Sequence, residues 1–394
     1  MGIFMDNNEF FKRLAYDIMA IFFYVIYLFP INNNKILLIM THDDSDEGNV
    51  GTVYRFFQRK NQDLIFKKVT RDNFTFKQNK NLFKNLIYMF IFVPYHMATS
   101  KTIFMDNVFL PFSTIKVKKD TRLVQLWHGT GAIKKFGLEC EEGWIKKLGI
   151  ATNKNTTHFI VGSSWMIEIY KTAFGTIEDK IFNIGCPRTD IFFNKRILQE
   201  RRKEFVQEYP ELSKKKLVLY APTFRDNDNT KDEIKIHLDI DKMMSYLDEN
   251  YVLGIRLHPY LTNKINLNKY LHGSYKNRVF DFSLYNKLNT LLICSDILIT
   301  DYSSIIYEFA ILEKPMIFYS YDLDKFEKSG RGFYENYKST VPGPIAFKTD
   351  EIIDIIRSGI TGSDYTYKFL STYLENCDGH STKRLYHLLM ENIK

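Results

Sequence analysis

Short apolar runs of strand length alternate along the chain with segments whose apolar residues recur at helical spacing. This alternation predicts parallel β-sheets covered by helices. A charged stretch at 194–216 interrupts the series and is interpreted as a solvated helix and linker, so the chain is predicted to form two doubly wound α/β domains. Predicted strands lie at 35–40, 103–106, 123–126, 158–162 and 181–184, and near Leu217, Val252, Val279, Ile297 and Met316. Predicted helices include 51–58, 82–97 and 305–312.

The segment 297–315 carries the clearest signal for a binding site. An apolar strand is followed by a polar turn and then by a helix with one apolar face. The turn contains Asp301, Ser303 and Ser304, which are residue types that cap helix N-termini. A helix N-terminus at the carboxyl end of a strand is a natural position for a phosphate group. Taken alone, the segment favours a capped helix that binds nothing, because caps of this kind are common.

Four more predicted strands end in small, basic or imidazole residues. In doubly wound folds the functional residues collect at such strand ends. The four segments are Leu-Trp-His-Gly-Thr-Gly at 126–131, Gly-Cys-Pro-Arg-Thr-Asp at 185–190, Tyr-Ala-Pro-Thr-Phe-Arg at 220–225 and Arg-Leu-His-Pro at 256–259.

These motifs, in this order, resemble the CDP-glycerol glycerophosphotransferase family of teichoic-acid synthesis. The resemblance rests on the strand-end motifs at 125–130, 185–188, 256–259 and 300–304 and on Arg-Gly-Phe-Tyr at 331–334, and it extends over about residues 36–388. It implies a glycosyltransferase-B-like fold, in which two Rossmann-like domains face a cleft. It also implies transfer of glycerol phosphate from CDP-glycerol to a hydroxyl of a lipid-linked glycan, with release of CMP, in wall teichoic acid or capsule synthesis.

Two histidines are candidate bases for this reaction, because imidazole exchanges a proton near neutral pH. His128 lies in a glycine-flanked turn, and His258 lies between Arg256 and Pro259 at a strand end. The resemblance favours His128 as the base on the acceptor hydroxyl and His258 as a phosphate contact that stabilises the leaving CMP. The reverse assignment stays open.

The remaining candidate residues divide between donor and acceptor. Arginine suits the donor because its planar fork matches phosphate oxygens. Candidate donor-binding residues are Thr223, Arg225, Arg256, Asp301, Ser303, Ser304 and Arg331. Candidate acceptor-binding residues are Gly129, Thr130, Lys134, Lys135 and Arg188. Arg188 and Asp190 are expected to pair with each other or across the domain interface.

No metal or other cofactor is expected. The acidic run at 43–47 lacks the glycine and glutamate of a calcium loop and is interpreted as a solvated turn. The four cysteines are widely spaced and form no zinc motif, and they favour a cytoplasmic compartment. The net charge of +8 suits an anionic partner, and no nucleic-acid-binding fingerprint is present.

The N-terminal segment 10–30 is apolar and rich in aromatic residues. Its charge-free part, 18–29, has 12 residues, whereas a membrane-spanning helix needs about 20. Lys12 and Arg13 precede it, which favours a helix that lies at the cytoplasmic face of an anionic membrane. The alternatives are a helix packed on the first domain, a true span or a signal peptide. The predicted division is a docking helix at 1–34, an acceptor domain at 35–200 and a CDP-donor domain at 201–394.

Three other functions compete with the first. A transferase of CDP-ribitol or another polyol phosphate would use the same fold. A nucleotide-sugar glycosyltransferase would share the fold but transfer a sugar. A non-catalytic scaffold on the membrane surface would depend on its N-terminal helix alone. The length of 394 residues favours a priming enzyme over a polymerase of the family.

Overall fold

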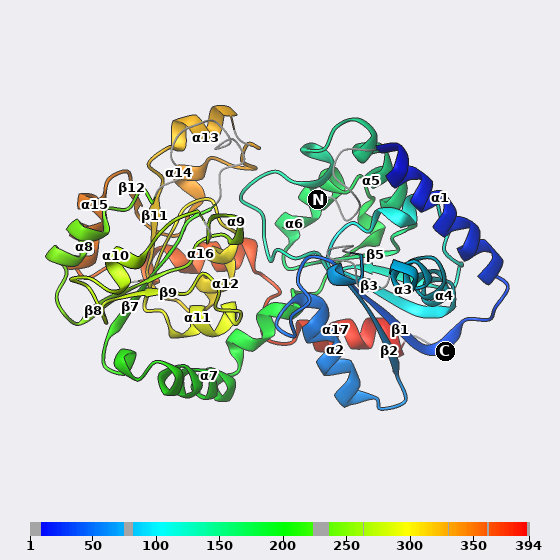
Figure 1. Cartoon of the computed structure of the whole chain (residues 1–394), viewed down its shortest axis with the longest axis horizontal. Helices are drawn as coiled ribbons and strands as arrows, with labels where there is room; N and C mark the ends of the chain where they lie inside the picture. The colour runs from blue at the N-terminus through cyan, green and yellow to red at the C-terminus, as the bar shows by residue number, and fades with distance from the viewer. Residues whose placement is uncertain are drawn as a thin grey trace. The chain divides into compact units, whose positions relative to one another are not determined.

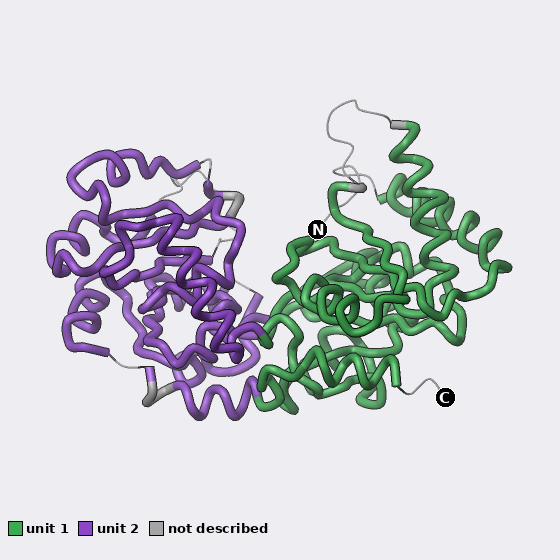
Figure 2. Tube along the Cα trace, turned by 90° about the horizontal axis from the view of Figure 1, so that it is seen from below, with its two compact units in different colours: residues 1–130, 136–190, 375–394 green, residues 131–135, 191–374 purple. Residues whose placement is uncertain are grey.

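The computed structural model describes residues 9–74, 82–223, 236–262, 264–329, 331–360 and 362–391. The chain divides into two compact units (Figure 2). Unit 1 comprises residues 1–130, 136–190 and 375–394, and unit 2 comprises residues 131–135 and 191–374. Each unit is built on its own parallel sheet.

The sheet of unit 1 has the strand order β2-β1-β3-β4-β5-β6, with all neighbours parallel. Its strands are β1 (Asn32–Met40), β2 (Ile65–Thr70), β3 (Ser100–Met105), β4 (Arg122–Gln125), β5 (His158–Val161) and β6 (Ile181–Asn183). Because strand side chains alternate between faces, Leu37, Ile39 and Ile103 pack in one core, and Ile36, Leu38 and Phe104 in another. The sheet is therefore covered on both faces, as the apolar runs predict.

Helices cover both faces of this sheet (Figure 1). The α-helices of unit 1 are α1 (Glu9–Ile26), α2 (Asn49–Lys60), α3 (Leu82–Ile87), α4 (Val93–Thr99), α5 (Gly143–Asn155), α6 (Ser164–Ala173) and α17 (Ser381–Tyr386). Two π-helical segments, η2 (Tyr88–Phe92) and η8 (His387–Glu391), continue α3 and α17. The predicted helix 82–97 is therefore a run of α3, η2 and α4. The 3₁₀ segments are η1 (Arg71–Phe74), η3 (Leu110–Ser113), η4 (Gly137–Glu139), η5 (Glu178–Lys180) and η6 (Pro187–Phe193).

The sheet of unit 2 has the order β12-β11-β10-β7-β8-β9 and is also parallel throughout. Its strands are β7 (Lys216–Ala221), β8 (Tyr251–Ile255), β9 (Val279–Asp281), β10 (Ile297–Thr300), β11 (Met316–Tyr319) and β12 (Ile345–Ala346). Its helices are α7 (Lys195–Glu208), α8 (Ile240–Tyr246), α9 (Pro259–Thr262), α10 (Asn268–Leu271), α11 (Leu288–Cys294), α12 (Ile305–Ile311), α13 (Leu323–Ser329), α14 (Tyr337–Thr340), α15 (Thr349–Arg357) and α16 (Ser363–Tyr373), with the 3₁₀ segment η7 (Pro210–Leu212). Two sheets of this kind confirm the predicted α/β class.

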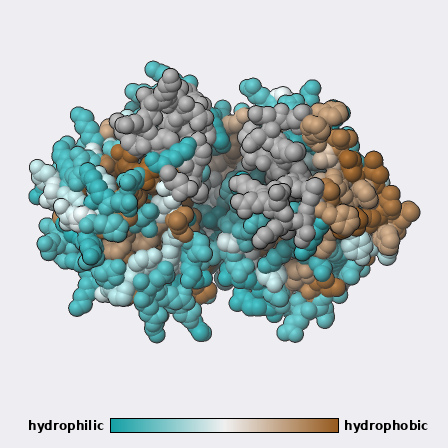
Figure 3. All heavy atoms as spheres, in the orientation of Figure 1, coloured by the Kyte–Doolittle hydropathy of each residue, from teal (hydrophilic) through white to brown (hydrophobic). Residues whose placement is uncertain are grey.

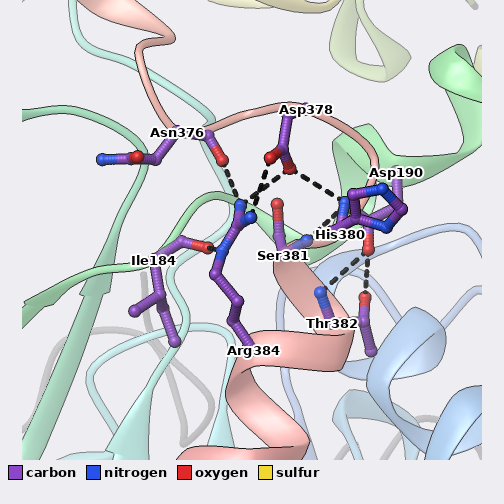
Figure 4. A network of polar contacts seen from close by, with 8 residues as sticks. All are labelled: Ile184, Asp190, Asn376, Asp378, His380, Ser381, Thr382 and Arg384. Atoms are coloured by element: carbon purple, nitrogen blue, oxygen red, sulfur yellow. Dashed lines mark hydrogen bonds and ion pairs between the residues drawn. The ribbon is translucent and has the colours of Figure 1, made fainter.

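The two units differ from the predicted domains at both ends of the second domain. The main part of unit 2 begins at residue 191, and residues 375–394 belong to unit 1. The physical reason is a polar network in unit 1 (Figure 4). The carboxylate of Asp190 accepts hydrogen bonds from the backbone N–H groups of Ser381 (3.0 Å) and Thr382 (2.8 Å) and from the Thr382 hydroxyl (2.7 Å). Asp190 thereby caps α17 and does not pair with Arg188.

Arg384 completes this network. Its guanidinium forms a two-pronged ion pair with Asp378, at 2.8 Å for each nitrogen, and its Nε donates to the carbonyl oxygen of Ile184 (2.8 Å) (Figure 4). The C-terminal segment is therefore fastened to the loop that follows β6, which the sequence spacing alone does not reveal.

Replacing Asp190 by alanine is expected to destabilise unit 1 by about 1–3 kcal/mol, because it leaves buried donors at the start of α17 without their acceptor. Urea denaturation followed by far-UV circular dichroism measures the change. Asp63→Ala, at an exposed turn position of the same unit, is the matched control. An unchanged midpoint for Asp190→Ala would show that the cap contributes no stability.

The N-terminal helix α1 packs on unit 1 along one face only. Tyr16, Met19 and Phe23 are buried at helical spacing in the core that α4 and η2 share. On its other face Ile21, Val25 and several further apolar side chains are exposed, as the brown surface over α1 in Figure 3 shows. Within the described residues, no helix is both long and apolar enough to cross a membrane.

Candidate active site

In unit 1 a single buried carboxylate organises the ends of the central strands. Asp106 directly follows β3 and is 2 % exposed. Its carboxylate accepts hydrogen bonds from the backbone N–H groups of Thr41 (2.9 Å), His42 (3.1 Å) and Asp43 (2.9 Å), which follow β1. Burial raises the pKa of Asp106 to about 6, although the three N–H donors favour its ionised form. Asp106 thus fixes the loop after β1 on the loop after β3.

His128 is held by the main chain of the same aspartate. Its Nδ1 lies 3.1 Å from the carbonyl oxygen of Asp106. A carbonyl oxygen can only accept a hydrogen bond, so Nδ1 carries the proton and Nε2 keeps a lone pair. Burial, with smaller contributions from His42 and Arg188, lowers the pKa of His128 to about 3. The imidazole is therefore neutral at pH 7, and its Nε2 is available to accept a proton.

The turn that carries His128 has an unusual backbone. Trp127 has a φ of 56°, in the left-handed region where side chains other than glycine are strained. Its N–H donates to the side-chain oxygen of Gln125 (2.9 Å). Asn49, at the start of α2, donates from Nδ2 to the carbonyl oxygens of Leu126 (3.2 Å) and Trp127 (3.0 Å). Strained residues of this kind persist where the surroundings hold them in place, and they cluster at functional sites.

Arg188 joins the same turn from the segment after β6. Its backbone N–H donates to Asn49 (2.9 Å), and its Nη1 donates to the carbonyl oxygen of His128 (2.6 Å). Gly129 and Thr130 are buried in this turn. The structure therefore brings the predicted residues His128, Gly129, Thr130 and Arg188 together. Arg188 supports the main chain of the turn, a role that the sequence does not indicate.

Sequence reasoning missed three residues of this site, namely His42, Asn49 and Asp106. His42 comes two positions after the predicted strand 35–40, and Asp106 ends the predicted strand 103–106, so the rule that function collects at strand ends would have selected both. Asn49 has no comparable signal, because its importance depends on bonds to residues more than 70 positions away.

In unit 2 the corresponding strand ends are those of β7, β8 and β10, which are neighbours in the sheet. The buried carboxylate of Asp301 accepts from the backbone N–H groups of Thr223 (2.9 Å) and Tyr302 (2.7 Å). The Tyr337 hydroxyl donates to the Asp301 carbonyl oxygen (3.0 Å). Asp301 therefore ties the end of β7 to the end of β10. Arg225, the other candidate donor residue after β7, lies outside the described residues.

The two serines of the turn after β10 differ in exposure. Ser303 is partly buried, and its hydroxyl accepts from the N–H of Ile305 (3.4 Å), at the first turn of α12. Ser304 is exposed and makes no side-chain cap bond to the helix. The structure thus confirms the strand, turn and helix predicted for 297–315, with the hydroxyl of Ser304 on the surface.

Arg256 and His258 follow β8. The Nη1 of Arg256 donates to the carbonyl oxygens of Phe282 (3.0 Å) and Tyr285 (2.6 Å), which fixes the loop after β9. Burial lowers the pKa of the Arg256 guanidinium from its ordinary value. His258 is exposed, immediately before α9. Arg256 therefore holds the loop after β9 in place, in addition to any contact that it makes with a ligand.

Lys134 and Lys135 belong to unit 2, although the prediction placed them in the first domain. The N–H of Lys135 donates to the carbonyl oxygen of Gly332 (3.0 Å), and Lys134 forms an antiparallel bridge with Phe333. The two lysines thus lie beside the loop that carries Arg331, which is exposed. Backbone hydrogen bonds join residues 133–135 to residues 332–334. The two lysines therefore belong to unit 2, although they follow His128 by only a few positions in the sequence.

The fold and its strand-end sites define a class. Two doubly wound parallel sheets, with polar side chains at the carboxyl ends of the central strands, are typical of glycosyltransferase-B-like proteins. The structure of the wall teichoic acid polymerase TagF superposes with a TM-score of 0.77 over 98% of this chain and 95% of that chain, at 22% identity. UDP-GlcNAc 2-epimerase from Neisseria meningitidis is more distant, with a TM-score of 0.57 at 15% identity over 91% of this chain and 100% of that chain. These likenesses confirm the predicted fold.

The family follows from the sequence comparisons. The family model for CDP-Glycerol:Poly(glycerophosphate) glycerophosphotransferase matches residues 21–391, so the chain belongs to this family, as the motifs predicted. The teichoic acid poly(ribitol-phosphate) polymerase of Bacillus spizizenii is 32% identical over 96% of this chain, and this chain spans 60% of that protein's length. The teichoic acid glycerol-phosphate primase of Bacillus subtilis is 34% identical over 79% of this chain and 78% of that protein. The chain is therefore an enzyme of the teichoic acid polyol-phosphate transferase family.

Proposed function

We propose that this enzyme transfers glycerol phosphate from CDP-glycerol to a hydroxyl of a lipid-linked glycan, with a polyprenyl diphosphate as the expected lipid carrier. The observation that carries the proposal is His128, whose neutral ring has a fixed tautomer and an unprotonated Nε2 in a glycine-flanked turn. The description of the family and the glycerol-phosphate primase among the relatives support glycerol as the polyol.

The reaction needs a base and a set of positive groups. In the proposed step, Nε2 of His128 takes the proton of the acceptor hydroxyl as its oxygen attacks the phosphorus that bears glycerol. The bond from that phosphorus to the bridging oxygen breaks, and CMP leaves with this oxygen.

The proposal assigns the donor phosphates to unit 2. The hydroxyls of Ser303 and Ser304 and the guanidinium of Arg331 are the candidate contacts, with His258 beside the leaving CMP. Hydroxyl and guanidinium groups stabilise the charge that spreads over phosphoryl oxygens in the transition state. Lys134 and Lys135, on the segment bonded to the Arg331 loop, add two positive charges to the same part of unit 2.

Ribitol phosphate is the second candidate, and a specific observation favours it. The teichoic acid ribitol-phosphate primase of Bacillus spizizenii is 32% identical over 91% of this chain and 91% of that protein, a wider coverage than that of the glycerol-phosphate primase. Incubating the protein with CDP-glycerol or CDP-ribitol and a lipid-linked acceptor, followed by mass spectrometry of the product, decides between them. An added mass of one or more glycerol phosphate units supports the proposal, and ribitol phosphate units overturn it.

Transfer is expected to proceed without a metal ion. Among the described residues, no three His, Cys, Asp or Glu side chains are grouped so that they could hold a metal. Basic side chains and backbone N–H groups would then neutralise the donor phosphates. Activity should survive dialysis against EDTA, measured as CMP released per minute. Loss of activity that magnesium restores, but that sodium chloride at equal ionic strength does not, would contradict this prediction.

The proposed acceptor requires the enzyme to reach a membrane, and α1 supplies a suitable surface. Its exposed apolar side chains continue onto α3, η2 and α4, because Phe22 packs near Phe90 and Phe29 near Tyr95, with ring centroids about 6 Å apart. We call this surface the α1 outer face; its exposed side chains are Phe10, Phe11, Leu14, Ile21, Phe22, Tyr24, Val25, Leu28, Phe29, Phe83, Leu86, Ile87, Ile91 and Tyr95. Arg13, Lys84 and Lys116 are exposed on the same elements or beside them. Apolar and basic groups together suit an anionic membrane surface at the cytoplasmic face.

Replacing Ile21, Val25 and Leu28 together by glutamine is expected to reduce binding to vesicles that contain anionic lipid about tenfold or more, because each apolar side chain inserted into the interface contributes to binding. Sedimentation with vesicles measures the loss. Polar replacements on the outer face are preferable to deletion of α1, whose inner face is part of the core. The pair Ile177→Gln and Leu284→Gln, also exposed apolar positions, is the control. Equal binding by both variants would place the docking surface elsewhere.

A further inference from the structure

The side chain of His42 lies flat against that of His128. The two ring centroids are 3.6 Å apart, and the ring planes differ by 13°. The histidines come from different strand ends, because His42 follows β1 and His128 follows β4, with β3 between them in the sheet. Two rings on different loops can stack this closely only if both loops are held in place.

Asp106, at the end of β3, fixes both loops at once. Its side-chain carboxylate holds the N–H groups of residues 41–43, which places the main chain of His42. Its main-chain carbonyl oxygen accepts the Nδ1–H of His128. One buried residue therefore sets the position of the first ring through the backbone and that of the second through a side-chain hydrogen bond.

A single hydrogen bond leaves the His128 ring one freedom. The imidazole can still rotate by small angles about its Cβ–Cγ bond while the hydrogen bond bends, which would swing Nε2 out of line. A flat ring stacked on one face removes this freedom, and the indole of Trp127, 4.1 Å from the His128 ring by centroids, restricts it further. Proton transfer requires such alignment, because a displacement of about 1 Å in a reacting group can cost about 100-fold in rate.

We propose that His42 is a positioning residue for His128: its stacked ring holds the plane of the His128 imidazole so that Nε2 faces the acceptor hydroxyl, and Asp106 places both rings. The inference rests on the proposed function, since it concerns the same base. The flat aromatic surface of His42 carries the role, and its nitrogens do not. A phenyl ring at position 42 can therefore replace it, whereas a methyl group cannot.

The test compares His42→Ala with His42→Phe in the full-length protein. His42→Ala should lower kcat about 10- to 100-fold with little change in KM for the CDP-polyol, because the donor phosphates are assigned to unit 2. His42→Phe should restore kcat to within about threefold of the wild type. His272→Ala, an exposed histidine of unit 2, is the control. An inactive His42→Phe would overturn the proposal in favour of a polar or proton-carrying role, and a fully active His42→Ala would show that stacking is dispensable.

A second measurement does not depend on the reaction. In histidine-labelled protein, the His128 ring protons should show the ring-current shift of a stacked neighbour, lose it in His42→Ala and keep such a shift in His42→Phe. If the wild type transfers no polyol phosphate at all, the proposed function fails. The spectrum then tests by itself whether His42 fixes the plane of the His128 ring. An unaltered His128 spectrum in His42→Ala would overturn it.

Discussion

Replacing His128 by alanine should lower turnover by about 100-fold or more, the usual contribution of a general base, while CDP-glycerol still binds. The ring is neutral, its Nδ1 is bonded to a carbonyl oxygen and its Nε2 is unprotonated, which is the state that the proposed base requires. Donor affinity should remain because the phosphates are assigned to residues of unit 2. Steady-state release of CMP gives kcat, and calorimetry gives the affinity for CDP-glycerol.

The control for this variant is His272→Ala, which removes an exposed imidazole. Near wild-type turnover in a folded His128→Ala protein would remove His128 from the mechanism and favour His258 as the base. The environment of His128 adds a pH test. Because burial lowers its pKa to about 3, the basic form is complete above about pH 5, and kcat/KM should not fall between pH 7.5 and 6 through titration of this residue.

The second large effect is expected at Arg331. Arg331→Ala should weaken CDP binding by about 1.5–3 kcal/mol, the range for a hydrogen bond to a charged group, which corresponds to about 10- to 150-fold in Kd. The exposure of Arg331 predicts that the variant folds normally. The CDP affinity of Arg331→Lys should lie between that of the wild type and that of Arg331→Ala, because lysine keeps the charge but lacks the planar fork.

Isothermal calorimetry with CDP measures this effect, with the exposed Arg357→Ala of the same unit as the control. Unchanged CDP affinity in Arg331→Ala would remove this residue from the donor site. Arg256→Ala would be a less informative variant. Loss of the Arg256 side chain would also remove the hydrogen-bond donor of the Phe282 and Tyr285 carbonyl oxygens. Weaker binding of CDP could then result from a displaced loop.

Most of the predicted strands carry apolar runs, and the reason is burial. Central strands of a parallel sheet are covered on both faces, so almost every residue is apolar, as in β1 from Ile36 to Met40. The strands without a prediction, β2 and β12, lie at sheet edges. In β2 most side chains are at least partly exposed, and lysines occupy two of its positions, so no apolar run marks it.

The sequence by itself determined the family, the α/β class and the strand-end positions of His128, Arg256, Asp301 and Ser304, because short motifs beside apolar runs are local features. Tertiary structure alone decided which of them meet. His42 and Asp106 reach His128 from different strands, Asp190 turns towards the C-terminal helix, and Lys134 joins unit 2. Each of these contacts joins residues that are more than 20 positions apart. The order of strands in the sheet brings the first three residues together, and the packing of α17 and the pairing of two loops decide the other contacts, which no local pattern encodes.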